Sequence, residues 1–335
     1  MTSQITHCRL CRSPELSTLV DLGEMPAANA LRRTADEEDR IFPLSVKMCG
    51  QCHLAQLSLT VPPEELFDNY VYFSSFSASW LEHGRRFTEK AIAGLGLNEH
   101  SLVVEAASND GYLLQHFQDR GIPVLGIEPA ANVADIAREK GIVTEVSYFG
   151  DAVAGDLATR GQRADLMIAN NLIAHVPDIH DFVRGLATVL KPSGVLSCEF
   201  PHLLHLMDEV QFDTIYHEHY FYFSLKPLIK IMRQCGLEVF DVEELSTHGG
   251  SLRVWAARKE SAPTPRVAVA KVLAAESAAG LYSSATCAQR LMKINDVRDG
   301  LCDFIASAHA ERRRIVGYGA AAKGNTLLNY CGVTA

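Results

Sequence analysis

From residue 102 to residue 200 the chain alternates short apolar runs with amphipathic stretches. The apolar runs are rich in Val, Leu and Ile, which favours buried strands, and the stretches between them have the three-to-four-residue apolar spacing of helices. Alternating strands and helices are typical of a parallel sheet with right-handed crossovers, so the pattern predicts a doubly wound α/β domain. The expected strands are 102–106, 123–128, 142–146, 164–169 and 194–200, and the expected helices are 111–120, 131–140, 151–160 and 178–190.

The hydrophobic pattern changes on either side of this domain. After residue 260 the alternation is lost, and Ala-rich helical stretches lead to a strand, a glycine-rich loop and a helix start at 314–326. One such unit cannot bury its own faces, so it must pack on a neighbouring domain or be incomplete. The other expected elements are helices at 81–93, 226–235, 267–280 and 288–309 and a hairpin of strands 237–243 and 251–257 that would close the sheet.

The stretch 102–114 is the centre of the predicted domain. Its strand ends near Glu105, a turn through small polar residues and Gly111 follows, and helical spacing resumes at Leu113. Such a loop presents backbone N–H groups to a ligand at the carboxyl edge of the sheet. Glu128 ends the second strand, where a carboxylate can accept hydrogen bonds from both hydroxyls of a ribose. The pattern predicts a nucleotide-type site, and the alternative is a tight turn that binds nothing.

This loop lacks the G-x-G-x-x-G pattern, so a dinucleotide is not the favoured ligand. The loop resembles that of class I methyltransferases, which hold S-adenosylmethionine with an acid on the first strand and a ribose-binding acid on the second. Two amides at the end of the fourth strand face the same crevice. On this resemblance the methyl donor would contact Glu105, Ser108, Asn109, Asp110, Gly111, Tyr112, Glu128, Asn170 and Asn171.

Length and composition set the class of protein. With 335 residues, 47% of them hydrophobic and 21% charged, the chain is long enough for two or three globular domains. A net charge of −9 argues against nucleic acid or an anionic membrane as partner. Residues 1–25 do not have the pattern of a signal peptide, and no stretch has the roughly 20 apolar residues of a membrane span, so we expect a cytoplasmic protein. Its nine cysteines therefore need a reason other than disulfides.

Four of these cysteines form two C-x-x-C pairs, Cys8 with Cys11 and Cys49 with Cys52. Each pair can direct two thiolates at one ion, and the two pairs together make a closed tetrahedral set suited to structural zinc. The spacing between the pairs exceeds the common one, so an insert must separate them. Four unrelated core cysteines or a redox pair are the alternatives. Four cysteine ligands leave no open position for catalysis.

Titratable side chains are concentrated in the stretch 213–223, which contains Tyr216, His217, Glu218 and His219 in succession. In an extended segment alternate residues share a face, so Tyr216 would face with Glu218, and His217 with His219. No third metal ligand with suitable spacing is evident, so acid–base chemistry is favoured over a metal site. His175, in the segment H-V-P-D after the fourth strand, would point into the space above the sheet.

Two further stretches leave their function open. Residues 70–80 are rich in aromatic and hydroxyl side chains, which suit packing and helix capping as well as they suit a sugar or an adenine. We expect this stretch, within 63–90, to be a lid or a bridge into the main domain. In the turn after His248, two glycines followed by Ser251 and Arg253 could hold a phosphate or could be a hairpin turn with an exposed Arg.

Taken in order, these motifs resemble the nucleotide-sugar C-methyltransferases of deoxysugar biosynthesis. The resemblance covers nearly the whole chain: the paired C-x-x-C knuckles, E-x-A-S-N-D-G-Y, N-x-x-x-H-V-P-D, Y-H-E-H, H-G-G-S-L-R and G-Y-G-A-A-x-K-G-N-T. Members of that family methylate C3 of a 4-keto-2,6-dideoxy sugar carried on thymidine diphosphate. The family's carboxy-terminal domain is longer than the part present here, so the resemblance predicts an incomplete substrate-binding domain.

The resemblance also implies roles for individual residues. His219 would be the base that forms an enolate, with His175 and Tyr216 near the developing oxyanion and Glu218 orienting His219 or relaying its proton. The sugar nucleotide would contact Tyr70, Tyr72, His248, Arg253, Lys323 and Asn325. The rival functions are an O- or N-methyltransferase on the same scaffold and a zinc-anchored, non-catalytic nucleotide-sugar binding protein. We expect a zinc-binding domain at 1–65, a methyltransferase domain at 66–260, and a helical linker with the start of a substrate-binding domain at 261–335.

Overall fold

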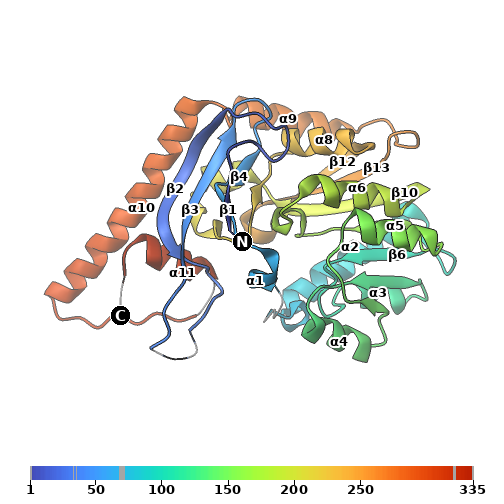
Figure 1. Cartoon of the computed structure of the whole chain (residues 1–335), viewed down its shortest axis with the longest axis horizontal. Helices are drawn as coiled ribbons and strands as arrows, with labels where there is room; N and C mark the ends of the chain where they lie inside the picture. Colours follow the sequence, from blue (N-terminus) through green and yellow to red (C-terminus); the bar gives the residue numbers. More distant parts are fainter. Residues whose placement is uncertain (1, 33, 35, 68–71, 320–321, 334–335) are drawn as a thin grey trace.

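The computed structural model describes residues 2–32, 34, 36–67, 72–319 and 322–333. Tyr70, which the sequence assigns to the sugar pocket, lies outside these residues. Two sheets organise the chain: a central sheet built from residues 103–258, and an N-terminal sheet bordered by a long C-terminal helix (Figure 1).

The central sheet has seven strands in the order β12-β13-β10-β9-β6-β7-β8. Strands β6 to β10 pair in parallel, and β13 runs antiparallel to both of its neighbours. This arrangement confirms the doubly wound α/β fold closed by an antiparallel pair. The strands are β6 (Val103–Ala106), β7 (Val124–Ile127), β8 (Thr144–Glu145), β9 (Ala164–Ile168), β10 (Leu190–Pro201), β12 (Leu237–Leu245) and β13 (Ser251–Arg258).

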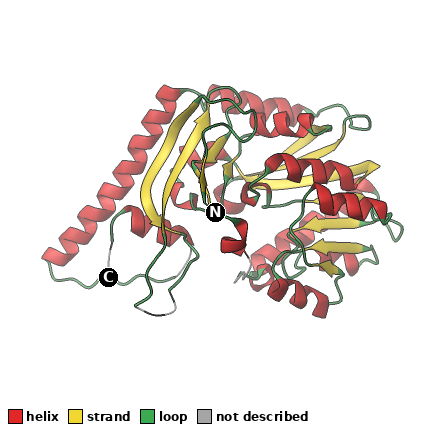
Figure 2. Cartoon of the chain, in the orientation of Figure 1, coloured by secondary structure: helices red, strands yellow, loops and turns green. Residues whose placement is uncertain are grey.

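Helices cover both faces of this sheet (Figure 2). Because side chains alternate along a strand, Val103 packs with Phe87 and Leu114 on one face, and the next residue, Val104, packs in the other core with Leu157. The first face is covered by α2 (Ala78–Leu95) and α3 (Leu114–Gln118), and the second by α5 (Asp151–Thr159), α6 (Ile179–Val189) and α8 (Leu225–Gln234). Helix α4 (Ala131–Glu139) follows β7.

The helix expected at 111–120 is shorter than predicted. Gly111 has a φ of 74°, and the helical hydrogen bonds begin only at Leu114. The residues before it therefore extend the loop at the carboxyl end of β6, where a ligand site is expected.

The N-terminal sheet joins segments from distant parts of the sequence. Its strand order is β11-β4-β3-β2. Strand β11 (Phe221–Tyr222) comes just after residues 216–219, which we call the His-rich stretch, and pairs with β4 at Gln56 and Ala55. The sheet thus holds one end of the His-rich stretch. Its other strands are β2 (Leu16–Pro26), β3 (Ile41–Cys49) and β4 (Ala55–Leu57), and a smaller pair consists of β1 (Ser3–Gln4) and β5 (Leu59–Thr60).

The C-terminal segment returns to this N-terminal sheet. After α9 (Val267–Ala278), the long helix α10 (Ser284–Ala310) runs along β2, and α11 (Ala322–Tyr330) packs against β2 and residues 212–214 (Figure 1). The strand predicted at the start of the segment 314–326 is wrong for its described residues: from 314 to 319 the backbone is irregular, and Ile315, Val316 and Tyr318 are exposed. Across the described ranges, no helix combines the length and apolar character that a membrane span requires.

Candidate active site

The loop after β6 curls tightly at the carboxyl edge of the central sheet. Ala107, Asn109 and Gly111 all have left-handed backbone conformations, with φ of 53°, 51° and 74°. The buried carboxylate of Glu128 accepts from the backbone N–H of Asn109 and of Ala130, each at 3.0 Å. Burial raises the pKa of Glu128, and these two hydrogen bonds oppose that effect. Each oxygen keeps a second lone pair, which is what a ribose diol requires.

Glu105 lies beneath this loop and is completely enclosed. Its Oε2 makes no hydrogen bond within the described structure. Burial raises the pKa of Glu105 well above the usual carboxyl range, and the charges of Glu128 and Asp110 raise it further. A neutral carboxyl group with an unused oxygen fits a site that receives a polar ligand.

The 72–76 segment is fastened to the same loop. The side chain of Asn109 accepts from the backbone N–H of Ser74 at 2.8 Å and donates to the carbonyl of Tyr72 at 3.1 Å. Asp110 accepts from the hydroxyl of Ser75 and pairs with Lys140 at 3.2 Å. The side chains of Asn109 and Asp110 therefore bind this segment, whereas the Tyr72 ring stays half exposed beside the loop.

At the end of β9, the two amides predicted to contact the methyl donor differ in their hydrogen bonding. Asn170 accepts from the Ser197 hydroxyl at 3.1 Å. Asn171 is left-handed, with a φ of 55°, and its backbone N–H donates to the carbonyl of Glu199 at 2.6 Å. Both side-chain atoms of Asn171 are buried and make no hydrogen bond within the described residues, so this amide suits a bound ligand better than Asn170 does.

The His-rich stretch forms a tight turn rather than a strand. The backbone N–H of His219 donates to the carbonyl of Tyr216 at 3.0 Å, and the rings of these two residues lie 4.1 Å apart. The ring of His175 meets that of His219 edge-on at 4.6 Å. The prediction that His217 and His219 share a face is wrong, because the turn directs His217 to Phe42 of the N-terminal sheet, 5.6 Å away.

The protonation of both imidazoles follows from their contacts. The Nδ1 of His219 donates to the carbonyl of Thr214 at 2.9 Å, so a neutral ring keeps its lone pair on Nε2. Burial, aided by His175, lowers the pKa of His219 well below its usual value. Burial likewise lowers the pKa of His175 to about 4, and this ring hydrogen-bonds the backbone of Glu218. Each neutral ring has only one N–H and gives it to the backbone, so neither can donate to an oxyanion.

Glu218 makes a different contact from the one expected. Its carboxylate accepts from the side-chain amide of Asn29 at 2.5 Å, whereas Thr214 holds the ring of His219. Burial raises the pKa of Glu218 to about 7, although the hydrogen bond from Asn29 lowers it. This carboxyl group therefore titrates near neutral pH.

Trp80 connects the His-rich turn to the loop after β6. Its ring stacks near Tyr112 at 6.2 Å on one side and meets His248 at 5.1 Å on the other. His248 in turn is close enough for its charge to act on His175 and His219. Trp80 and His248 therefore place the imidazoles and the loop on the same side of the central sheet's carboxyl edge. The sequence analysis did not select Trp80, which is one of only two tryptophans in the chain.

Arg253 lies buried against a carboxylate. It is 4% exposed and donates to Glu199 at 2.8 Å, and Glu199 also pairs with His83 at 3.1 Å and accepts from Thr247 at 3.1 Å. Although burial raises the pKa of Glu199, His83 and Arg253 lower it overall. Arg253 therefore neutralises a buried carboxylate and is not the exposed Arg of one sequence interpretation. Its contact with a phosphate, the other interpretation, stays a prediction. A cavity of about 250 Å³ lies beside this group.

Lys323 and Asn325 of α11, both predicted to contact the nucleotide, differ in whether the side chain already makes a hydrogen bond. Asn325 donates from Nδ2 to the carbonyl of Ala28 at 2.6 Å, so its amide ties α11 to the N-terminal sheet. Lys323 is exposed. Burial raises the pKa of Asp213 and lowers that of His219; the positive charge of Lys323 opposes the first effect and adds to the second. Lys323 thus remains available to an anionic substrate, whereas the amide of Asn325 is already engaged.

The four predicted zinc ligands converge. Their sulfur atoms all lie within 4.8 Å of one another, and the Sγ pairs Cys8–Cys52 and Cys11–Cys49 are both 3.5 Å apart. A tetrahedral zinc with Zn–S bonds of about 2.3 Å requires separations near 3.8 Å, so the set fits this ion. The two knuckles have the same shape: Arg12 and His53 both have a φ of 62° and donate to the carbonyl of the first cysteine of their pair.

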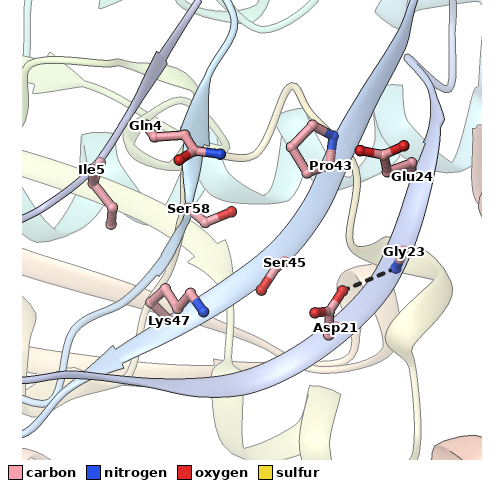
Figure 3. Close-up of a pocket in the computed structure, with 9 residues that line it drawn as sticks. All are labelled: Gln4, Ile5, Asp21, Gly23, Glu24, Pro43, Ser45, Lys47 and Ser58. Carbon is pink, nitrogen blue, oxygen red and sulfur yellow. Dashed lines mark hydrogen bonds between the residues drawn. The ribbon is translucent and has the colours of Figure 1, made fainter.

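A second hollow, of about 390 Å³, lies on the same N-terminal part of the chain (Figure 3). Asp21, Glu24 and Lys47 line it together with the buried Ser45, and Asp21 accepts from the backbone N–H of Gly23 at 3.0 Å. None of the residues that the sequence analysis selected lines this hollow.

Comparison with known proteins identifies the family. C-methyltransferase NovU of Streptomyces niveus is 35% identical over 333 residues, which cover 98% of this chain and 79% of NovU. The chain belongs to the C-methyltransferase family. Three family models match this methyltransferase: "Putative zinc binding domain" at residues 8–67, "Methyltransferase domain" at 80–242 and "C-methyltransferase C-terminal domain" at 246–335. The four-cysteine cluster is accordingly a structural zinc site.

More distant relatives match only part of this methyltransferase. The ubiquinone biosynthesis O-methyltransferase of Acinetobacter baylyi is 27% identical over 149 residues, which are 41% of this chain and 61% of that protein. Among solved structures, magnesium protoporphyrin IX methyltransferase of Synechocystis PCC 6803 covers 57% of this chain and 86% of its own, with 17% identity and a TM-score of 0.40. Neither likeness bears on the substrate.

In this methyltransferase we expect Glu199→Gln to destabilise the fold by about 3 kcal/mol, because it leaves the buried charge of Arg253 with only the more distant carboxylate of Glu243, at 3.8 Å, as counter-ion. Urea unfolding would measure the change. Glu238→Gln is the matched control, since its partner Arg233 is 60% exposed and such a surface pair contributes at most about 1 kcal/mol. Equal effects of the two substitutions would contradict the prediction.

Proposed function

We propose that this C-methyltransferase uses S-adenosylmethionine to methylate a 4-keto deoxysugar nucleotide at C3, the carbon next to the ketone, through an enolate that His219 forms as base. The observation that supports this most strongly is the state of His219: its Nδ1–H is held by the Thr214 carbonyl, and burial keeps the ring neutral. A neutral imidazole with a free Nε2 lone pair is a general base ready to act at neutral pH.

The methyl donor would occupy the loop after β6. Glu128 would accept from the ribose hydroxyls, and the unpartnered groups of Glu105 and Asn171 would contact polar parts of the donor. When bound, S-adenosylmethionine supplies an electrophilic methyl group on a sulfonium sulfur. Ser108, Gly111 and Tyr112 would shape this site, and the left-handed backbone at Asn109 and Gly111 aims the loop at it.

The enolate needs both a base and a donor to its oxygen. A carbon next to a ketone is acidic because its anion delocalises onto oxygen, and a hydrogen bond to that oxygen lowers the barrier. Because its ring lies 4.1 Å from that of His219, we propose the phenol of Tyr216 as that donor. His175 would then pack against His219 and limit its movement.

The sugar nucleotide would lie between the imidazoles and α11. Tyr72 and His248 have exposed side chains at the edge of the crevice, and the exposed ammonium group of Lys323 suits a diphosphate.

The proposal is tested by proton exchange without methyl transfer. The enzyme, saturated with S-adenosylhomocysteine, is incubated in D₂O with a panel of 4-keto nucleotide sugars, and loss of the C3 proton signal is followed by NMR. We expect the enzyme to exchange the C3 proton for deuterium. When labelled S-adenosylmethionine replaces S-adenosylhomocysteine, we expect methylation at C3. Methyl transfer to oxygen or nitrogen without such exchange would reject the enolate.

We expect Gly111→Ala to weaken binding of S-adenosylmethionine at least tenfold and to destabilise the fold by about 2–4 kcal/mol. An added Cβ would collide with Ile142 Cδ1, and a left-handed φ of 74° is unfavourable for Ala. Calorimetric titration measures the binding. Gly121→Ala is the control, because Gly121 has a φ of 72° but open space around its Cα, so only the backbone cost of about 1–2 kcal/mol should remain.

A further inference from the structure

One side chain of the zinc-binding part of the chain hydrogen-bonds a carboxylate in the His-rich turn. The Nδ2 of Asn29, just beyond the end of β2, lies 2.5 Å from the Oε1 of Glu218, although the two residues are 189 positions apart. Glu218 is 4% exposed. A buried carboxylate depends strongly on the few donors that reach it, because it has lost its hydration.

The backbone on both sides of this contact is held in place. The carbonyl of Ala28, next to Asn29, accepts from the Asn325 amide at 2.6 Å, and the Thr326 hydroxyl donates to the carbonyl of Ile215 at 3.2 Å. Helix α11 thereby fastens the Asn29 loop and the His-rich turn to one another. The Asn29–Glu218 hydrogen bond therefore joins two segments, the Asn29 loop and the His-rich turn, that α11 already holds together.

We propose that Asn29 is a positioning residue of the active site, whose amide holds the carboxyl group of Glu218 within the turn that carries His219. The inference rests on the proposed function in one respect only, that this turn carries the base. It assigns the zinc-binding domain a part in the reaction beyond its own folding, because that domain supplies the donor that keeps Glu218 ionised and oriented.

The surroundings of Glu218 make the amide decisive for its charge. The backbone carbonyl of Glu218 accepts a hydrogen bond from His175. Its neighbours along the chain, His217 and His219, both have a lowered pKa because they are buried. The charge of Glu218 also acts on Tyr220, whose phenol donates to the carbonyl of Val61. Burial favours the neutral acid, and the Asn29 hydrogen bond opposes this. Removing the donor should therefore raise the pKa of Glu218, and an acidic residue at position 29 should raise it further.

The experiment is a ¹³C NMR titration of the full-length zinc protein labelled at the glutamate carboxyl carbon. The Glu218 signal is assigned by its absence in Glu218→Gln or, should that variant not fold, by its response in Asn29→Asp. We expect a midpoint about 0.5 to 1 pH unit higher in Asn29→Ala, a larger increase in Asn29→Asp, and near wild-type behaviour in Asn29→Ser, which keeps a donor. Arg32→Ala is the control, since Arg32 lies on the same loop and pairs with Asp39.

Activity gives the second measurement. At pH 7 we expect kcat of Asn29→Ala to fall about two- to fivefold, because a pKa that rises by 0.5 to 1 unit from about 7 lowers the ionised fraction of Glu218 by that factor. KM should stay within twofold, and the loss should be recovered as the pH is raised. An unchanged Glu218 titration in Asn29→Ala overturns the inference, whatever the reaction proves to be. A shifted titration supports it. If turnover then shows no matching change with pH, the premise that fails is that the turn carrying Glu218 also carries the base.

Discussion

Cys52→Ser is expected to abolish zinc binding and to unfold the N-terminal sheet. Cys52 is 3% exposed and its sulfur lies 3.5 Å from that of Cys8 within the four-cysteine cluster. A serine hydroxyl does not ionise near neutral pH and cannot replace a thiolate ligand. Structural zinc sites contribute roughly 10–16 kcal/mol in small peptides, more than the typical stability of a whole domain.

This loss should extend to the reaction. Strand β11 pairs with β4 of the N-terminal sheet and directly follows the turn that carries His219. Unfolding of the sheet therefore frees both the turn and Asn29, and we expect methyl transfer to fall below detection. Elemental analysis for zinc, the thermal unfolding midpoint and a methyl-transfer assay measure the three effects.

Cys235→Ser is the matched control for this experiment. Cys235 is a partly exposed thiol at the end of α8, outside the four-cysteine cluster. We expect that variant to keep one zinc ion per chain, a near wild-type unfolding midpoint and full activity. A Cys52→Ser protein that retains zinc and unfolds at the wild-type temperature would refute the structural role of the metal.

The central sheet could be predicted because its signal is local. Strands such as β6 and β9 are buried on both faces and consist mostly of apolar residues, and the helices between them bury one side only. The cysteine spacing is equally local, because each C-x-x-C pair forms its own turn. Both features could therefore be predicted without knowledge of contacts between distant segments.

The features that the sequence analysis missed depend on contacts between distant segments. Nothing in the composition of 216–219 distinguishes a turn from a strand; the pairing of β11 with β4 favours the turn, by drawing the chain back to the N-terminal sheet. Similarly, the sequence does not show that Arg253 is buried, because its ion-pair partner Glu199 comes from a different strand. The Asn29 contact is invisible in the sequence for the same reason, since its partner lies 189 residues away.

Replacement of His219 should have the largest effect on the chemistry itself. We expect His219→Asn to slow C3 proton exchange and methyl transfer by 10²- to 10⁴-fold, the range over which a positioned general base contributes. Asparagine keeps a polar group near the Thr214 carbonyl but has no basic nitrogen at neutral pH, so the turn should survive while the base is lost. NMR exchange in D₂O with S-adenosylhomocysteine bound separates this step from methyl transfer.

The neighbouring histidine provides the control. His217→Asn alters an imidazole two residues away whose ring packs on Phe42, outside the crevice, so a folded His217→Asn protein should exchange the C3 proton at nearly the wild-type rate. Exchange at the wild-type rate in His219→Asn would show that another group removes the proton. Because His175 is also neutral and lies 4.6 Å from His219, the double variant His175→Asn/His219→Asn would then show whether His175 acts as the base instead.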